Sequence, residues 1–382
     1  MDRLHVLRRF YSLDALRGVA ALSVVLWHWQ HFFNPFNRQG LSFVMQRQPL
    51  FGVLELFYRN GSAAVQLFFC LSGFIFFWLY SKPVADRRVS FRSFAVLRFS
   101  RLYPLHFATL VCVALGQLAY TSTTGTPFVY PFNDAWHFLL NVLFVSSWGV
   151  EKGPSFNAPI WSVSVEVLMY VVFFMFCRIF NRSLLAMIGA VGAGYFMRRF
   201  NDAMGTGIVG FFIGGIVFVV YDWAVDAGHV RKLSVWCSLV TVLAWLAAFA
   251  AAGPGHGFDF AGAPWIMRKL VSGSDVAVLF PLTILTLAFI ETRRGTLGKR
   301  CAFIGDISYS SYLLHFPLQL TVALVAAKLA IDPKLFYSPS FMAAFFLVLI
   351  VMSWASHRYF EVPAQRYLRR RLGPEVHSRA AS

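Results

Sequence analysis

Charged residues are scarce in this chain. They make up 13% of its 382 residues, whereas soluble globular proteins average about 25%. Several apolar runs approach the roughly 20 residues that cross the hydrocarbon core of a bilayer. In a chain with such apolar runs, only helices can cross the lipid, because a helix forms all of its backbone hydrogen bonds internally. The sequence therefore excludes a soluble globular protein and predicts an all-α integral membrane protein, a polytopic bundle of helices.

Acidic residues are scarcer than basic ones, with 17 Asp and Glu against 34 Lys and Arg. This excess does not indicate a nucleic-acid partner, because basic residues of multi-span proteins gather in cytoplasmic loops and meet anionic membrane lipids. The five cysteines lie far apart and show no metal-ligand spacing, so we expect no metal. The basic run near the C-terminus is expected beside lipid of the inner leaflet: Arg366, Arg369, Arg370 and Arg371.

About ten membrane-spanning helices are predicted, in a single transmembrane domain that covers residues 1–382. They are 15–33, 62–80, 99–119, 161–177, 183–197, 206–221, 233–252, 276–291, 305–328 and 340–360. If the shorter run 136–148 does not span, the inner loops carry 21 Lys and Arg and the outer loops 9; if it spans, the totals are 14 and 16. The positive-inside rule therefore favours ten spans, cytoplasmic tails at 1–12 and 364–382, and a re-entrant or surface-lying helix at 136–148.

Arg17 and His28 are ionisable residues within the first predicted span, where such groups are costly and usually mark a site. Eleven residues separate them, so they share one helix face at a spacing of about 16 Å. Histidine is the side chain best suited to take a hydroxyl proton near neutral pH. The alternative interpretation is an interfacial histidine beside Trp27 and Trp29, with Arg17 extending toward the inner surface.

Arg98 and Arg101 share a face at the inner end of the third predicted span. Guanidinium groups suit bidentate binding of phosphate, so a phosphorylated cytoplasmic ligand could dock there. The alternative is that these arginines only reflect the positive-inside rule.

Glu166 is a lone carboxylate near the outer end of the fourth predicted span, after Ser162 and Ser164. It can approach the depth of His28 and serve a site there, or it can belong to a polar pair that joins two helices. A polar stripe at three-residue spacing allows the same two interpretations: Asp306, Tyr309, Tyr312 and His315. The glycines of SGF at 72–74 and GFFIGG at 210–215 predict close helix packing.

These patterns, in this order, resemble the membrane acyltransferase-3 family, whose bacterial members acylate sugars of surface glycans. The matching stretches are LDALRGVAALSVVLWH, FFCLSGF, RFSRLYPLH, NAPIWSVSVEVLMY, GDISYSSYLLH and FEVP, and they run from residue 13 to 363. The chain departs from the family at Ala158, where a second proline is common, and at Val167, where a second acid is frequent. Many members carry a further esterase-like domain, and we expect the stand-alone form here.

The resemblance implies catalytic roles for His28, Arg17 and Glu166, and binding of an acyl-CoA donor by Arg98 and Arg101. Acceptor-binding or supporting roles are expected for a further set: Ser164, Trp161, Tyr309 and His315.

The resemblance further implies that the protein transfers an acyl group, with acetyl from acetyl-CoA expected, to a hydroxyl of a carbohydrate or glycolipid acceptor. We expect this at the bacterial inner membrane, with both termini cytoplasmic. Direct transfer and a short-lived acyl-enzyme are both compatible with the sequence. The alternative function is a multi-span transporter or flippase of a surface-glycan precursor, which would also need polar groups within the membrane.

Overall fold

The computed structural model describes residues 9–33, 43–252 and 275–372, and every regular element within these ranges is a helix. The helices of ten or more residues are α1 (Tyr11–Trp27), α2 (Phe51–Asn60), α3 (Ala64–Ala85), α4 (Phe91–Thr124), α6 (Trp161–Phe180), α7 (Leu184–Met197), α8 (Asp202–Asp226), α9 (Val230–Ala252), α11 (Phe280–Arg294), α13 (Ser308–Lys328), α14 (Pro339–Ser356) and α15 (Val362–Leu372). Residues 1–8 and 373–382 of the predicted tails lie outside the described residues.

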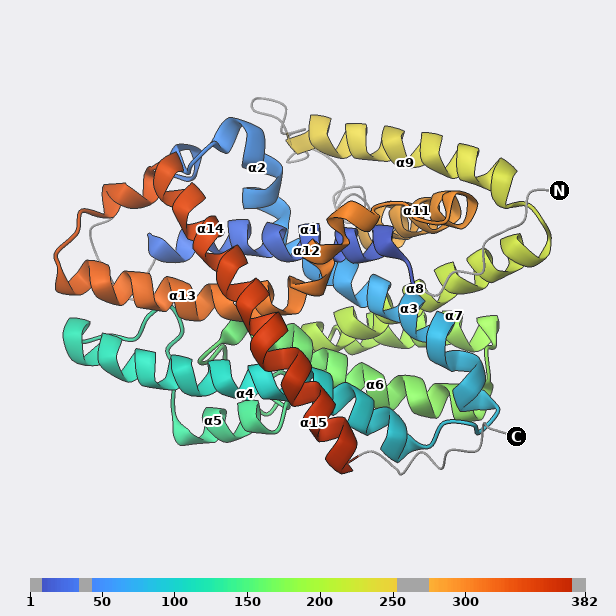
Figure 1. The fold of residues 1–382 in the computed structure, drawn as a ribbon, viewed down its shortest axis with the longest axis horizontal. Helices are drawn as coiled ribbons and strands as arrows, with labels where there is room; N and C mark the ends of the chain where they lie inside the picture. Colours follow the sequence, from blue (N-terminus) through green and yellow to red (C-terminus); the bar gives the residue numbers. More distant parts are fainter. Residues whose placement is uncertain (1–8, 34–42, 253–274, 373–382) are drawn as a thin grey trace.

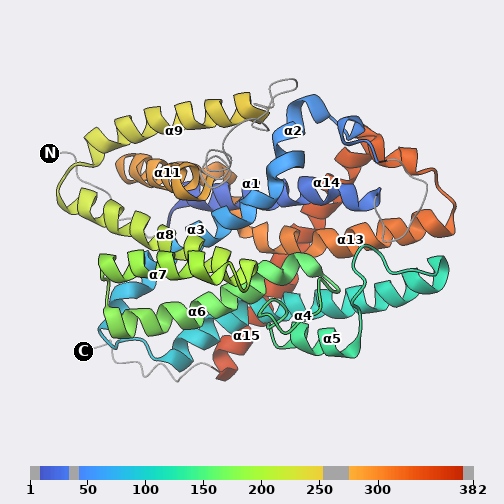
Figure 2. The same cartoon turned by 180° about the vertical axis from the view of Figure 1, so that it is seen from behind.

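Most of the long helices run along the longest axis of the molecule (Figure 1). Helix α1 contacts α3, α13 and the short helix α12 (Ala302–Asp306), while α13 packs along α4. Helix α14 crosses the bundle obliquely and continues through the π-helical segment η9 (His357–Glu361) into α15. Figure 2 shows this crossing from the other side, behind the bundle. The result is a polytopic helical membrane protein, as the apolar runs predict.

The number of spans differs from the prediction. Seven helical segments among the described residues are long and apolar enough to cross a membrane. Two predicted spans, 15–33 and 183–197, fall on α1 and α7, which have 17 and 14 residues. At about 1.5 Å per residue, neither α-helix reaches the roughly 30 Å of a hydrocarbon core. The predicted span 276–291 falls on η6 (Asp275–Leu279) and α11, and the residues before it lie outside the described part of the chain. Within the described residues, the structure supports seven spans rather than ten.

Two predicted spans are also interrupted. In the first predicted span, 15–33, the α-helix ends at Trp27, and the chain continues in the 3-10 helix η1 (His28–Phe32). The run 305–328 is divided at Ile307 between α12 and α13. The short segment 136–148 forms only the eight-residue helix α5 (Ala135–Val142), about 12 Å long, which is too short to cross a bilayer.

Glycines allow α3 and α8 to approach closely, as predicted for SGF and GFFIGG. A Cβ atom on Gly73 would lie 1.9 Å from the carbonyl oxygen of Phe211, and one on Gly214 would lie 2.0 Å from that of Cys70. Neither position has room for a side chain. Small residues permit this kind of backbone contact in membrane helices, where packing rather than water expulsion drives association.

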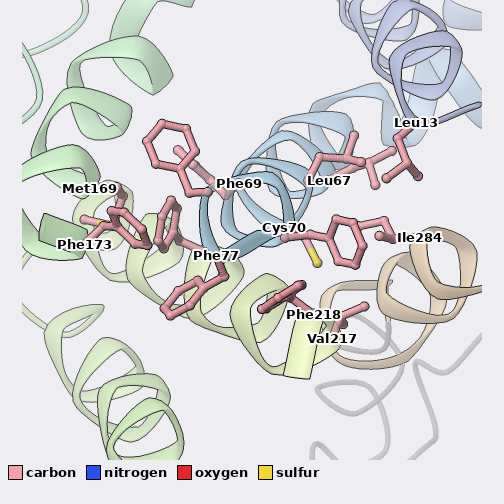
Figure 3. Close-up of a cluster of buried hydrophobic side chains, with 14 of the residues drawn as sticks. Leu13, Leu67, Phe69, Cys70, Phe77, Met169, Phe173, Val217, Phe218 and Ile284 are labelled. Atoms are coloured by element: carbon pink, nitrogen blue, oxygen red, sulfur yellow. The ribbon is translucent and has the colours of Figure 1, made fainter. Parts of the chain in front are cut away.

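Large apolar side chains fill the space around this contact. Figure 3 shows Phe69 and Phe77 of α3 beside Phe173 of α6 and Phe218 of α8. Phe77 and Phe173 are fully buried, with ring centroids 5.1 Å apart in an edge-to-face arrangement. This core fixes α3, α6 and α8 relative to one another, and with them the polar residues on their other faces.

The start of α1 is held by a carboxylate from α11. Glu291 is fully buried and accepts hydrogen bonds from the backbone N–H groups of Tyr11 and Ser12, at 2.8 and 2.9 Å, and from the Ser12 hydroxyl. The first N–H groups of a helix lack partners within the helix, and a negative charge at that end is favourable. This contact fixes the helix that carries Arg17 and that leads into His28.

Candidate active site

A cavity of about 130 Å³ lies among helices α1, α3, α4, α6 and α13. Its lining includes five of the residues predicted from the sequence, together with Tyr312 from the polar stripe: Arg17, Arg98, Arg101, Glu166, Tyr309 and Tyr312. The structure thus brings Glu166 and both predicted donor-binding arginines into one space.

Arg98 lies among aromatic rings at the side of this cavity. Its guanidinium carbon is 4.8 Å from the ring centre of Tyr80 and 4.9 Å from that of Phe76, within the range of cation–π attraction. It also donates to the Tyr80 hydroxyl. The Nε atom of Arg98 is buried and has no hydrogen-bond partner among the described residues, so donor capacity remains at this site.

The Arg17 guanidinium contacts three groups of the protein itself. It forms an ion pair with an Asp14 carboxylate oxygen at 2.9 Å, and it donates to the Ser308 hydroxyl at 3.0 Å and to the Gly305 carbonyl at 2.9 Å. Arg9 in turn pairs with both Asp14 and Asp306. These bonds join α1 to α12 and α13, so Arg17 contributes to the packing of α1 as well as to the charge of the cavity.

Glu166 accepts two hydrogen bonds at a single oxygen. The Ser72 hydroxyl donates to Oε1 at 3.1 Å, and the Tyr170 hydroxyl donates to it at 2.7 Å. Oε2 has no hydrogen bond from the described residues. The sequence suggested that Glu166 approaches the depth of His28. The structure places it on the cavity shared with Arg98 and Arg101.

His28 and His315 form a buried pair. Nδ1 of His28 lies 2.9 Å from Nε2 of His315, and the two rings stack with centroids 5.0 Å apart. Neither of them lines the cavity described above. The predicted base therefore has a direct partner 287 residues away in the sequence.

The hydrogen bonds of this pair define where its protons lie. Nδ1 of His315 is 2.6 Å from the carbonyl oxygen of Tyr312. A carbonyl only accepts, so Nδ1 of His315 carries the proton and its Nε2 is the acceptor when the ring is neutral. His28 must then donate from Nδ1, which leaves the lone pair on its Nε2. This nitrogen has no hydrogen-bond partner among the described residues.

A third imidazole belongs to the same cluster. The ring of His31 stacks on His28 with centroids 4.6 Å apart. Its Nδ1 donates to Oε1 of Gln319 at 3.2 Å, and the Gln319 amide donates to the backbone oxygen of His28 at 3.0 Å. The Tyr130 hydroxyl lies 3.3 Å from Nε2 of His31. These contacts fix the backbone at His28, where the α-helix gives way to η1.

Tyr312 connects the cavity with the histidines. Its side chain lines the cavity, and its carbonyl accepts from His315. Its hydroxyl lies 2.9 Å from the Ser162 hydroxyl and donates to the Pro159 carbonyl. The cationic cavity and the histidine pair are therefore adjacent but separate, with Tyr312 between them.

The remaining predicted residues lie in different surroundings. Tyr309 lines the cavity and donates to the Leu102 carbonyl at 2.6 Å. Ser164 is fully buried and donates to the Phe144 carbonyl at 2.7 Å. Trp161 packs against Phe69, with ring centroids 6.2 Å apart. Ser164 and Trp161 do not line the cavity.

Sequence reasoning missed four polar residues of the site: Asp14, Ser72, Tyr170 and His31. Tyr170 could have been found, since it follows Glu166 by one helical turn. His31 similarly follows His28 by three residues. Ser72 and Asp14 gave no comparable signal, because their partners come from other parts of the chain.

Comparison with known proteins provides evidence independent of this geometry. A family model described as an acyltransferase domain matches residues 10–357. Acyltransferase MdmB of Streptomyces mycarofaciens is 31% identical over 179 residues, which are 46% of this chain and 41% of that protein. Protein 2 in the picA locus of Rhizobium radiobacter is 30% identical over 200 residues, 42% of this chain and 93% of its own length.

A third relative, ORF330 of Acidianus two-tailed virus, is 23% identical over 83% of this chain and 85% of its own. The chain spans less than half the length of MdmB. No solved structure matches. Because the family model covers most of the chain, including all residues of the cavity and the histidine pair, the chain belongs to the acyltransferase-3 family.

Proposed function

We propose that this protein is a membrane-bound O-acyltransferase that moves an acetyl group from acetyl-CoA to a hydroxyl of a carbohydrate or glycolipid. The donor comes from the cytoplasm of a bacterial cell, and the protein lies in the inner membrane. The observation that carries the proposal is the His28–His315 pair beside a cavity lined by three arginines. Membership of the family favours acyl transfer over a transporter or flippase.

His28 acts as the general base in this proposal. Its Nε2 lone pair takes the proton of the acceptor hydroxyl while the hydroxyl oxygen bonds to the thioester carbonyl carbon. The carbon–sulfur bond then breaks, and the CoA thiolate recovers the proton from His28. Both histidines are buried, at 5% and 0% exposure, so little water competes with the acceptor for the thioester.

The cavity holds the donor. Arg98 and Arg101 bind its phosphates, since charge-assisted hydrogen bonds from guanidinium groups are strong and suit phosphate geometry. Arg17 adds positive charge and holds α1 against α12 and α13. Glu166, oriented by Ser72 and Tyr170, limits the positive charge within the cavity. The thioester passes Tyr312 to reach His28.

The role of His28 can be tested by label transfer. Membrane vesicles that contain the full-length protein are incubated with radiolabelled acetyl-CoA, and label is counted in the extracted glycan and glycolipid fractions. His28→Ala should lower incorporation by about 100-fold or more, the usual contribution of a general base. The control is His229→Ala, which changes an exposed histidine and should transfer as the wild type does. Wild-type incorporation by His28→Ala would refute the assignment.

A further inference from the structure

Helix α15 does not extend away from the bundle. It follows α14 through η9 and lies against α4 (Figure 1). Glu361, the last residue of η9, accepts hydrogen bonds from Ser310 of α13 at 2.5 Å and from Ser356 at 3.0 Å. These bonds fix the position from which α15 begins, and therefore the direction in which its basic residues extend.

Arg369 of α15 forms a hydrogen bond with α4. Its Nε donates to the Ser100 hydroxyl at 3.3 Å, and Ser100 is only 1% exposed. Ser100 lies in the same helical turn as Arg98 and Arg101. Arg369 is partly exposed, but its Nε contacts the turn of α4 that carries the two cavity arginines, a contact that is not expected for a group that only meets lipid.

This region has more positive charge than the protein itself neutralises. The charges of Arg98 and Arg101 act on Arg369, and that of Arg101 acts on Arg17. Asp14 is already paired with Arg17 and Arg9. Within residues 9–33, 43–252 and 275–372, no carboxylate forms an ion pair with Arg98, Arg101 or Arg369.

Glu166 lines the same cavity, and Glu361 lies close enough to Arg101 for their charges to interact. These two carboxylates do not balance the three arginines, and an anion with several phosphate groups would relieve the remaining repulsion. Arg98 has a buried donor without a partner in the described part of the chain, and Arg101 is exposed and lines the cavity. We propose that α15 completes the donor site, with Arg369 binding phosphates of the CoA nucleotide together with Arg98 and Arg101. This inference rests on the proposed function, because it assumes a CoA thioester as donor.

The same helix provides a matched control. Arg370 follows Arg369 by about 100° around the helix, carries the same charge, and has no hydrogen bond or ion pair with the described residues. A general attraction between α15 and anions would involve both arginines. A specific phosphate-binding site at the contact with α4 would involve only Arg369.

The test is calorimetric titration of CoA into the full-length protein in nanodiscs of neutral phosphatidylcholine. Arg369→Ala should raise the Kd for CoA about tenfold or more, the usual effect of losing a hydrogen bond to a charged group. Arg370→Ala should leave the Kd unchanged. Arg369→Lys keeps the charge but loses the planar fork, so an intermediate Kd is expected. It also serves as the second variant if Arg369→Ala does not fold, as judged by thermal unfolding.

The outcomes separate the two proposals. If the wild type does not bind CoA, the proposed function itself fails. If the wild type binds CoA and Arg369→Ala binds it equally well, only the role of α15 is overturned. Repeating the titration in nanodiscs of anionic phosphatidylglycerol tests the alternative that Arg369 binds lipid. Arg369→Ala should still bind CoA more weakly than the wild type in these nanodiscs. If the variant instead changes only the response to phosphatidylglycerol, Arg369 binds lipid phosphate and the inference is wrong.

Discussion

The proton distribution in the histidine pair depends on residues from two distant parts of the chain. His28 is oriented by His315, which is itself fixed by the Tyr312 carbonyl. A neutral imidazole can donate from only one nitrogen, so this chain of bonds leaves the His28 lone pair on Nε2. In the proposed reaction, His315 is therefore a positioning residue that acts through His28.

Substitution of His315 should separate positioning from donor binding. His315→Leu removes the acceptor for Nδ1 of His28, so both tautomers of His28 become accessible and kcat should fall by about 10- to 100-fold. The KM for acetyl-CoA should stay near the wild-type value, because His315 does not line the cavity. Label transfer measured over a range of acetyl-CoA concentrations gives both constants.

His315→Gln is the conservative variant, since its side-chain oxygen can still accept from His28. It should recover part of the lost kcat. If both variants lose kcat equally, or if both mainly raise KM, the positioning role of His315 is not supported.

At the scale of elements, the contact between α3 and α8 determines where Ser72 and its neighbours lie. Gly73 and Gly214 bring the two backbones together, and the aromatic core of α3, α6 and α8 secures the contact. Ser72 is next to Gly73 and donates to Glu166 of α6. The close contact between α3 and α8 therefore also fixes the side of the cavity that Ser72 and Glu166 form.

Gly214→Ala should destabilise the protein by about 1–3 kcal/mol, because the new methyl group forces α3 and α8 apart. Its Cβ would lie 2.0 Å from the Cys70 carbonyl oxygen. Thermal unfolding in detergent measures the change. Gly189→Ala is the control, since no atom of the described residues lies within 4 Å of a Cβ built on Gly189 of α7. That variant should be neutral or slightly stabilised, and equal effects at both positions would contradict the packing account.

Over the whole molecule, the sequence is sufficient to predict helical membrane architecture and most of the charged residues that line the cavity. Scarce charge and long apolar runs show the class directly, and ionisable residues within such runs stand out. The pairing of His28 with His315 could not be predicted, because it depends on how α1 packs against α13. The span count was also too high, since hydropathy does not show where a helix such as α1 ends.

The site has two parts at this scale. The arginine-lined cavity lies among α1, α3, α4, α6 and α13, and the histidine pair lies beyond Tyr312. This division suggests that donor binding and acyl transfer depend on different residues. Arg101 lines the cavity and is exposed, whereas His28 is buried outside it.

The most direct test of this division is the rate of label transfer from acetyl-CoA as a function of donor concentration, in Arg101→Ala and His28→Ala. The account predicts that Arg101→Ala raises KM about tenfold or more and largely keeps kcat, because it weakens binding of the phosphates. It predicts that His28→Ala loses kcat by about 100-fold or more. Wild-type kinetics in both variants, or loss of kcat in Arg101→Ala with full kcat in His28→Ala, would contradict the account.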